Sequence, residues 1–244
     1  MAIRDEFISL ASHELRTPLT PLTLQMQGFA RLIEKGTFDA VPTEKLKYMV
    51  EISDYQVGRL TRLIEQLLDI SRISEGRWRH DPERVDLISV IRSVAQQLHH
   101  EMVVAECSLD FDMPQSLFGF WDGLRLEQLM TNLLTNAIKY ASGKPVSIRV
   151  EPSSETETVT ISVRDQGMGI ALEDQKRIFE RFERAVPSKN YGGLGLGLYI
   201  SRQIVELHEG KLDVQSEKGH GATFTVELPI RSQNVTLKSS ASGS

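Results

Sequence analysis

Two long runs of helical periodicity open the chain and constrain its fold more than any other feature. From about residue 3 to 34, apolar residues recur at spacings of three and four, as one face of a helix requires. From 44 to about 74, apolar residues repeat close to heptad spacing, with Ser53 as a polar break. A turn over residues 36–42 joins the runs, and Thr43 is a candidate N-cap for the second. The pattern predicts an antiparallel helical hairpin, and because one hairpin buries little apolar surface, a second copy completing a four-helix bundle.

The sequence changes in character after this hairpin. Residues 75–84 are polar, which places a domain boundary there. Asp86 and Asp122 are candidate N-caps for two helices, the first reaching about Glu101. Strand-like runs cover residues 108–112, 146–150, 159–164, 211–215 and 223–228. Because helices and strands do not alternate regularly, we predict an α+β two-layer sandwich rather than a Rossmann sheet.

The chain thus divides into a hairpin over residues 1–76, an α+β domain over 83–231 and a disordered tail over 232–244. Its formal net charge of -5 argues against nucleic acid as the main partner. Cys107 is the sole cysteine, which excludes an internal disulfide. No apolar run is long enough to cross a bilayer, and no signal peptide opens the sequence.

A histidine stands inside the first helical run, within the string Ser12-His13-Glu14-Leu15-Arg16-Thr17-Pro18-Leu19. A neutral imidazole is a competent nucleophile, and the Glu14 carboxylate can accept its proton or fix its tautomer. A lone His-Glu pair is most often a solvated surface pair, but the length of this string favours function. No second histidine follows at i+4, so the string is not a zinc motif. Pro18 and Pro21 predict a kink just after His13.

Two amide side chains, Asn132 and Asn136, lie one turn apart on the helix predicted after Asp122. An amide oxygen is a hard ligand that suits Mg²⁺ bridging phosphates. Lys139 and Tyr140 continue the same face and offer a phosphate counter-charge and an aromatic wall. A polar helix edge is the alternative, although the rest of this helix is apolar.

Asp165 ends a strand-like run and is followed by Gly167 and Gly169. Its carboxylate can accept a hydrogen bond from an exocyclic amine such as adenine N6, while the glycines let the backbone approach a flat base. An ordinary strand-to-turn segment has the same residues, so this motif alone leaves both interpretations open.

A second glycine-rich loop, residues 192–197, precedes a helical stretch and can offer free N–H groups to phosphate. No Gly-Lys-Ser/Thr follows, so the loop is not a Walker A motif. Between the two glycine elements, Phe179 and Phe182 stand among arginines. This segment is typical of a mobile lid, and an amphipathic surface helix is the alternative.

With these residues in view, the chain resembles the catalytic core of the sensor histidine kinases of two-component systems, over about residues 3–231. The string around His13 is similar to that family's H box. The remaining boxes follow in the family's order: the N box at 132–140, the G1 box at 165–169, the F box at 178–182, the G2 box at 193–197 and a final glycine motif at 219–224.

The resemblance implies a dimerisation and histidine-phosphotransfer hairpin followed by a Bergerat-type ATP-binding domain that uses ATP and Mg²⁺. His13 is implied to take the γ-phosphoryl group, Glu14 to be its base, and Thr17 to orient a water that dephosphorylates a partner. Asn136 is implied to hold Mg²⁺. The other implied nucleotide contacts are Asn132, Lys139, Tyr140, Asp165, Gly167, Gly169, Phe179, Phe182, Gly193, Leu194, Gly195, Leu196, Gly197 and Thr223.

Type II topoisomerase ATPases of the wider superfamily carry a water-activating glutamate one turn before the Mg²⁺-binding asparagine. Here that position is Asn132, so we expect the site to position ATP for a histidine rather than hydrolyse it. Domain motion across residues 75–84 is then part of the mechanism. The alternatives are an ATPase of the same superfamily, a non-catalytic scaffold and a phosphatase-dominant enzyme.

The resemblance also sets expectations for partners and location. A second copy of the chain and a response regulator receiver domain are the expected partners, and nucleic acid is not. We expect the catalytic portion to be cytoplasmic, with no sensor or membrane segment in this chain and an inner-membrane anchor as one possibility for the full-length protein.

Overall fold

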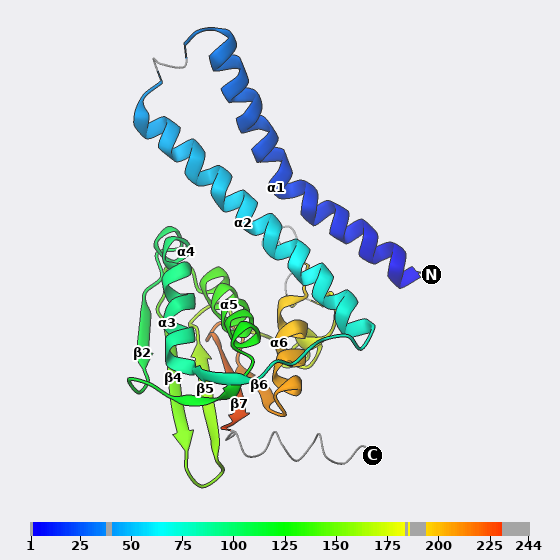
Figure 1. The fold of residues 1–244 in the computed structure, drawn as a ribbon, viewed down its shortest axis with the longest axis vertical. Coiled ribbons are helices and arrows are strands. Elements are labelled where there is room, and N and C mark those ends of the chain that lie inside the picture. Colours follow the sequence, from blue (N-terminus) through cyan, green and yellow to red (C-terminus); the bar gives the residue numbers. More distant parts are fainter. Residues whose placement is uncertain (1, 38–40, 184, 186–193, 231–244) are drawn as a thin grey trace. The chain divides into compact units, whose positions relative to one another are not determined.

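The computed structural model describes residues 2–37, 41–183, 185 and 194–230, with side chains from Ala11 onward (Figure 1). The chain divides into two compact units, one built mainly on residues 1–78 and the other on residues 79–187 and 195–244. Their described parts are called here the helical hairpin (residues 2–78) and the sheet domain (residues 79–230).

Two long helices make the helical hairpin: α1 (Ala2–Glu34) and α2 (Thr43–Ser74). They run antiparallel, as the periodicity predicted (Figure 1). Helix α1 continues through Pro18 and Pro21, so neither proline ends it, and the kink stays a prediction. The polar break at Ser53 faces α1, because its hydroxyl donates to the side-chain amide oxygen of Gln25.

The start of α2 differs from the prediction. Thr43 is the first helical residue rather than the N-cap, and the N-cap residue makes no side-chain capping hydrogen bond. Pro42 occupies the N-cap position (φ -54°, ψ 136°), and its carbonyl accepts the N–H groups of Lys45 and Leu46 at 2.9 and 3.2 Å. The proline ring fixes φ at a value that suits the entry to a helix, so the cap prediction was wrong by one residue.

A five-stranded sheet in the order β2-β4-β5-β7-β6 forms one layer of the sheet domain. Strands β2 and β4 pair in parallel, and the other neighbours are antiparallel. The predicted strands are confirmed as β2 (Leu109–Asp112), β4 (Val146–Ser153), β5 (Thr158–Arg164), β6 (Lys211–Ser216) and β7 (Ala222–Pro229).

A small second sheet was not predicted. Strand β1 (Glu83–Asp86) pairs antiparallel with β3 (Phe118–Trp121). Each has four residues with partly exposed side chains, which is too short for apolar alternation to stand out.

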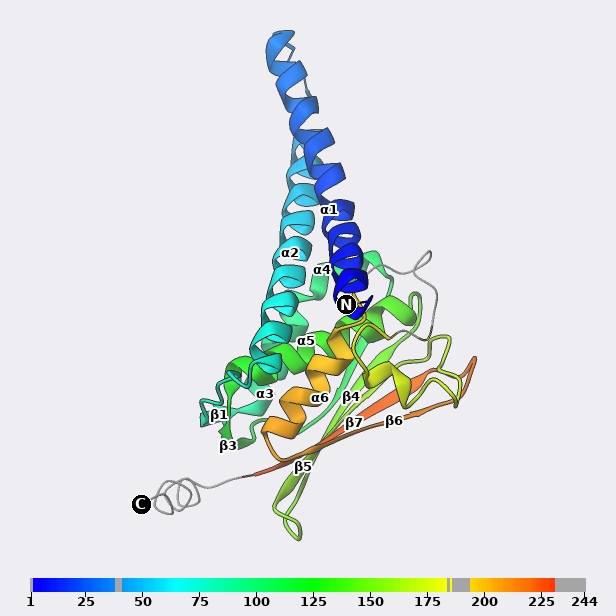
Figure 2. The same cartoon turned by 90° about the vertical axis from the view of Figure 1, so that its right-hand side faces the viewer.

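Helices cover one face of the sheet, as Figures 1 and 2 show. Asp86 accepts from Ile88 N at 3.2 Å and Asp122 from Arg125 N at 3.1 Å, so both predicted N-caps are confirmed. The first helix does not reach Glu101, because the helix breaks at Leu98 (φ -88°, ψ 7°). The helices are α3 (Leu87–Gln97), α4 (His99–Val104), α5 (Gly123–Tyr140) and α6 (Gly197–Leu207), and a 3-10 turn covers Arg177–Phe179.

The core of the sheet domain lies between α5, α6 and the sheet. Leu126, Leu129 and Leu133 repeat along one face of α5 and are completely buried. Strand β7 alternates buried and half-buried residues along its whole length, as a sheet with one covered face requires. The predicted α+β two-layer architecture is therefore confirmed. No helix in the described part of the chain is long and apolar enough to span a membrane.

Candidate functional site

The exposed imidazole of His13 lies on α1, with its side chain 75% exposed. Its Nδ1 is 3.8 Å from a carboxylate oxygen of Glu14, and the other Glu14 oxygen is 3.8 Å from an Arg59 guanidinium nitrogen on α2. These are ion-pair rather than hydrogen-bond distances. The carboxylate therefore stands between a titratable imidazole and a fixed positive charge.

Thr17 follows His13 by one helical turn and is exposed. Its hydroxyl donates to the His13 carbonyl at 3.1 Å. This bond is local, and because Pro18 and Pro21 remove two backbone donors from the same stretch, it adds a contact where the helix has lost some. Only a rotation of its χ1 would point the hydroxyl toward another group.

Helix α5 carries the two predicted asparagines on the face that meets α6. Asn132 is buried, and its Nδ2 donates to the Gly197 carbonyl at 3.1 Å, where α6 begins. Asn136, one turn further on, is half-buried and brings an amide oxygen to the same side. The structure therefore joins Asn132 to the second glycine-rich loop, 65 residues away in the chain.

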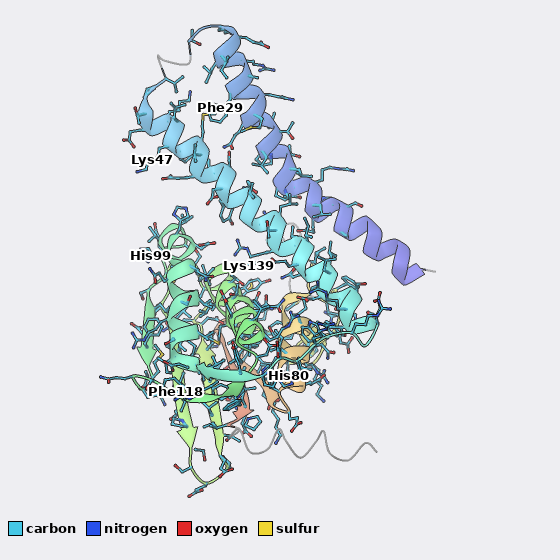
Figure 3. The ribbon with its side chains drawn as sticks, in the orientation of Figure 1. Phe29, Lys47, His80, His99, Phe118 and Lys139 are labelled. Atoms are coloured by element: carbon cyan, nitrogen blue, oxygen red, sulfur yellow. The ribbon has the colours of Figure 1, made fainter. Side chains whose placement is uncertain are left out.

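The end of α5 holds Lys139 and Tyr140, both half-buried. The Lys139 ammonium lies 4.8 Å from the centroid of the Tyr140 ring (Lys139 is labelled in Figure 3). A cation over an aromatic face keeps its charge while its stem packs on the ring. The pair brings a positive charge and an aromatic surface to the end of the helix that carries the asparagines.

Asp165 is a buried carboxylate directly after β5. Its Oδ1 accepts the backbone N–H groups of Gly167 at 2.8 Å and Ala222 at 3.3 Å. Burial raises the pKa of Asp165, although these two N–H donors and the positive charge of Lys144 oppose the shift. Its other oxygen, Oδ2, accepts no hydrogen bond among the described residues, so it can accept one from a ligand amine.

Three glycines around Asp165 stand at positions where a side chain would not fit. A Cβ on Gly167 would lie 2.3 Å from the Tyr140 carbonyl oxygen, and one on Gly169 (φ +67°) would lie 2.0 Å from the Glu217 carbonyl oxygen. A Cβ on Gly221 would be 2.1 Å from the Asp165 carbonyl oxygen. Glycine at these positions lets the loop pack directly on α5 and on the β6–β7 turn.

Thr223 lies beside this loop on β7. It is half-buried and pairs with Arg164, the residue before Asp165, while its other neighbour is Gln215 on β6. The sheet register therefore brings Thr223 next to the buried carboxylate, which accepts the N–H of the preceding residue, Ala222.

The two phenylalanines differ in their surroundings. Phe179 is buried and packs edge-on against Phe224 of β7, with ring centroids 6.4 Å apart. Phe182 is half-buried and has a left-handed backbone (φ 67°). A Cβ on Gly195 would lie 2.9 Å from the Phe182 carbonyl carbon, so the backbones of these two segments meet. Phe179 thus fixes one end of the segment predicted to be a lid.

The second glycine-rich loop leads directly into α6. Leu194, Gly195 and Leu196 precede the helix, Gly197 is its first residue, and no side chain from the N-cap position satisfies its first turn. Those N–H groups form the kind of helix start that binds phosphate. Gly193 lies outside the described residues.

Sequence reasoning missed three residues that hold the Asp165 loop. Ser216 accepts from Ile170 N at 2.8 Å and donates to the Gly221 carbonyl at 2.6 Å. Gln175 donates to the Ser216 carbonyl at 2.7 Å. Lys144 donates to the Gln166 carbonyl at 2.8 Å. Single polar residues in loops give no sequence signal, although Ser216 does stand close to the recognised glycine motif.

These features define a class of protein. A helical hairpin presents an accessible imidazole, and an α+β domain presents a carboxylate, an amide pair and uncapped helix N–H groups suited to a nucleotide. Two family models match the chain. The "His Kinase A (phospho-acceptor) domain" matches residues 3–76, and the "Histidine kinase-, DNA gyrase B-, and HSP90-like ATPase" matches residues 121–232.

Individual proteins agree with these models. Sensor histidine kinase MtrB of Mycobacterium tuberculosis (strain ATCC 25618 / H37Rv) is 37% identical over 238 residues, which cover 96% of this chain and 41% of MtrB. The solved structure of the Acinetobacter baumannii histidine kinase AdeS aligns with a TM-score of 0.64 at 27% identity, over 90% of this chain and 98% of AdeS. Histidine kinase ThkA, solved in complex with response regulator protein TrrA, shares the fold (TM-score 0.59, 23% identity, 94% of this chain and 63% of ThkA).

The chain therefore belongs to the sensor histidine kinases, with a phosphoacceptor domain followed by an ATPase domain. It spans about two fifths of the length of MtrB, 41%. The resemblance found in the sequence is confirmed.

Proposed function

We propose that this chain is an ATP- and Mg²⁺-dependent kinase core that phosphorylates His13 and then passes the phosphoryl group to an aspartate of a response regulator. The observation that carries the proposal is the state of Asn132. Its amide is committed to the Gly197 carbonyl at 3.1 Å, and an amide cannot act as a base. A site with no base at this position favours transfer to a histidine over fast hydrolysis of ATP.

The residues of the sheet domain fit the parts of Mg-ATP. The open Oδ2 of Asp165 can accept from the adenine amine, and Lys139 and the first turn of α6 can neutralise phosphate charge. The Asn136 oxygen is a hard ligand that would hold Mg²⁺. A Mg²⁺ held there would supply positive charge that offsets the negative charge developing on the phosphates during transfer.

The phosphoacceptor chemistry falls to His13. Glu14 lies nearest to Nδ1, at 3.8 Å, so it attracts the imidazole proton to that nitrogen and leaves the Nε2 lone pair as the nucleophile. Nε2 forms a bond to the γ-phosphorus while the bond from this phosphorus to the β–γ bridging oxygen breaks. That electron pair stays on ADP, and the imidazole proton passes to Glu14.

Two partners belong to the proposal. Apolar side chains on both hairpin helices are exposed, including Leu24 at 63% and Val57 at 50%, and a second copy would cover them in a four-helix bundle. The family model over residues 3–76, which is a phosphoacceptor domain, supports this arrangement. The ThkA complex supports a response regulator as the second partner.

A phosphatase activity toward that regulator is a second candidate function. It is favoured by the exposed Thr17 hydroxyl one turn from His13.

The proposal is tested by incubating the chain with γ-labelled ATP and Mg²⁺, beside His13→Gln and Asn136→Ala. We expect acid-labile, alkali-stable label on the unchanged chain and none on either variant. Free phosphate released without protein label, and unaffected by His13→Gln, would show an ATPase instead. No label together with no nucleotide binding would show a scaffold.

A further inference from the structure

The segment that joins the hairpin to the sheet domain is held by a hydrogen bond within each of these two units. We propose that Arg79 is the one residue of this joint that rotates freely. We further propose that Trp78, Asp122 and His208 are positioning residues that set how the ATP-binding domain reaches His13. This inference rests on the proposed kinase function, and it names the residues that control domain motion.

The hairpin side of the joint begins with the end of α2. Gly76 has φ +65°, its N–H binds the Ile73 carbonyl at 3.1 Å, and Arg77 N–H binds the Arg72 carbonyl at 2.9 Å. This pair of bonds is a Schellman motif, which reverses the chain at a helix end. The reversal lets Trp78 Nε1 donate to the buried carboxylate of Asp69 on α2 at 3.3 Å.

The sheet-domain side begins two residues later. The His80 ring (labelled in Figure 3) packs edge-on against His208, with centroids 4.7 Å apart. The backbone N–H of Asp81 donates to Asp122 Oδ2 at 3.1 Å. Arg79, which stands between the two anchored residues, is exposed. A change in the direction of the joint must therefore use the dihedrals around Arg79 or break one of these contacts.

His208 holds Asp122 from within the core. It is buried, its Nε2 accepts the Asp122 backbone N–H at 3.0 Å, and its Nδ1 lies 2.8 Å from the Ile204 carbonyl. A nitrogen that accepts an N–H carries no proton, so His208 is the neutral tautomer with the proton on Nδ1. Asp122 also caps α5 by accepting Arg125 N–H through Oδ1. Asp122 thus joins the linker, the start of α5 and the end of α6.

This connection leads to the nucleotide residues. Along α5, Asn132 and Asn136 lie about 15 Å and about 21 Å from the N-cap Asp122, at 1.5 Å per residue. Near the middle of α5, Asn132 is bonded to Gly197, the first residue of α6, so α6 is joined to α5 at both of its own ends. The two helices therefore move as one body with residues 80–81, and loosening the anchors lengthens the flexible tether without touching the nucleotide site. A longer tether lowers the effective concentration of the donor near its acceptor.

Two conservative variants release one anchor each. Trp78→Phe removes the indole N–H and keeps an aromatic ring. Asp122→Asn keeps a capping oxygen and removes the second acceptor that Asp81 uses. Exposed His100→Ala on α4 is the matched control. All are made in the full chain, with autophosphorylation at saturating ATP, nucleotide affinity and the rate of tryptic cleavage after Arg77 and Arg79 measured together.

We expect both anchor variants to lower the autophosphorylation rate by about 2- to 10-fold, the range that one hydrogen bond corresponds to. Nucleotide affinity should stay unchanged and tryptic cleavage in the joint should become faster, while His100→Ala changes none of these. Inserting two glycines after Arg79 should lower the rate as well, and combining this insertion with Asp122→Asn should add little.

Unchanged cleavage and unchanged rates in both anchor variants would overturn the inference and leave the kinase assignment intact. A loss of nucleotide affinity that accounts for the lower rate would also overturn it. If the unchanged chain takes no label at all, the kinase assignment fails instead, and faster cleavage in the anchor variants alone would still demonstrate the anchors.

Discussion

The helical hairpin and the sheet domain keep their functional side chains in opposite environments. In the sheet domain, Asp165 and Asn132 are buried and held by hydrogen bonds to backbone groups far away in the chain. In the hairpin, His13 and Thr17 are exposed, and apolar residues on both helices are exposed as well. A group that binds a small ligand gains from a rigid, dry site, whereas a group that must meet two different partners has to remain accessible.

The two regions also differ in what stabilises them. The sheet domain closes its own core, and its central residues are completely buried. In the described part of the hairpin, one helix packs against one other and apolar side chains stay exposed, and in the proposed dimer a second copy would cover them. Stability in the sheet domain should therefore depend on single core side chains, and stability in the hairpin on association.

Ile161→Ala is the largest expected change. Ile161 is completely buried on the central strand β5, and its truncation should cost about 2–5 kcal/mol of unfolding free energy. Hydrogen exchange of individual amides is the measurement. Faster exchange across β4, β5 and β7 with unchanged exchange in α1 and α2 agrees with two separate cores, and equal loss of protection in the hairpin contradicts them.

Ile64→Glu tests the hairpin in the same way. Ile64 is 45% exposed on α2, on the seam with Val57 and Leu68. If a second copy covers it, a carboxylate there should weaken association by at least about 100-fold, because burying a charge costs several kcal/mol. Analytical ultracentrifugation measures the dimer. Leu172→Glu, at an 82% exposed apolar position of the sheet domain, is the matched control and should leave the dimer unchanged.

Asp165→Asn separates binding from stability within the sheet domain. Nucleotide affinity should fall about 10- to 100-fold, the range for losing a hydrogen bond to a charged group. Burial raises the pKa of Asp165, so the folded state penalises the ionised form at neutral pH. An asparagine avoids this penalty and still offers Oδ1 to Gly167 and Ala222, so the variant should be at least as stable as the unchanged domain.

The difference in stability between the unchanged domain and Asp165→Asn should depend on pH, and its direction follows from the raised pKa of Asp165. A raised folded-state pKa contributes stability that is fully present below the unfolded pKa and lost as pH rises through the folded value. The unchanged domain should therefore gain stability relative to Asp165→Asn as pH falls. Denaturant unfolding at several pH values measures it, and a gain that grows toward neutral pH contradicts it.

Asp86→Ala is the smallest expected change, about 1 kcal/mol for the loss of an N-cap. Burial acts to raise the pKa of Asp86, but hydrogen bonds from Leu117, Ser89 and Ile88 outweigh it and the pKa is lowered. This contribution is present above the unfolded pKa and lost as pH falls through the folded value, opposite to Asp165. Denaturant unfolding should show a lower unfolding free energy for Asp86→Ala than for the unchanged chain at neutral pH, and little of this deficit in acid. A deficit that persists in acid points to lost packing rather than to the charge.

Local patterns were enough to predict much of the fold. Helical spacing gave both hairpin helices, alternation gave the five strands of the main sheet, and Asp86 and Asp122 marked two helix starts. The strands β1 and β3 were missed because four residues are too few for a period to stand out. Thr43 was misplaced as a cap because Pro42 sets the entry to α2.

The candidate site also divides into residues that local sequence patterns indicate and contacts between distant parts of the chain that they do not. His13, Asn136 and Asp165 could be predicted as site residues because their types and spacing suit the chemistry and the motifs around them resemble those of a known family, and their roles stay predictions. The contacts that hold the site could not be predicted, because Asn132 meets Gly197 across 65 residues and Asp122 meets His208 across 86. Gly76 was the one local signal for the linker anchors, since a glycine directly after a helix indicates a chain reversal.

In the proposed mechanism, the two regions carry separable halves of one reaction. The most direct test measures, on the His13→Gln chain, both the affinity for a non-hydrolysable ATP analogue and the label taken from γ-labelled ATP. We expect the His13→Gln chain to bind the analogue with the affinity of the unchanged chain and to take no label. Label that persists on this variant, or affinity that disappears together with the label, would contradict it.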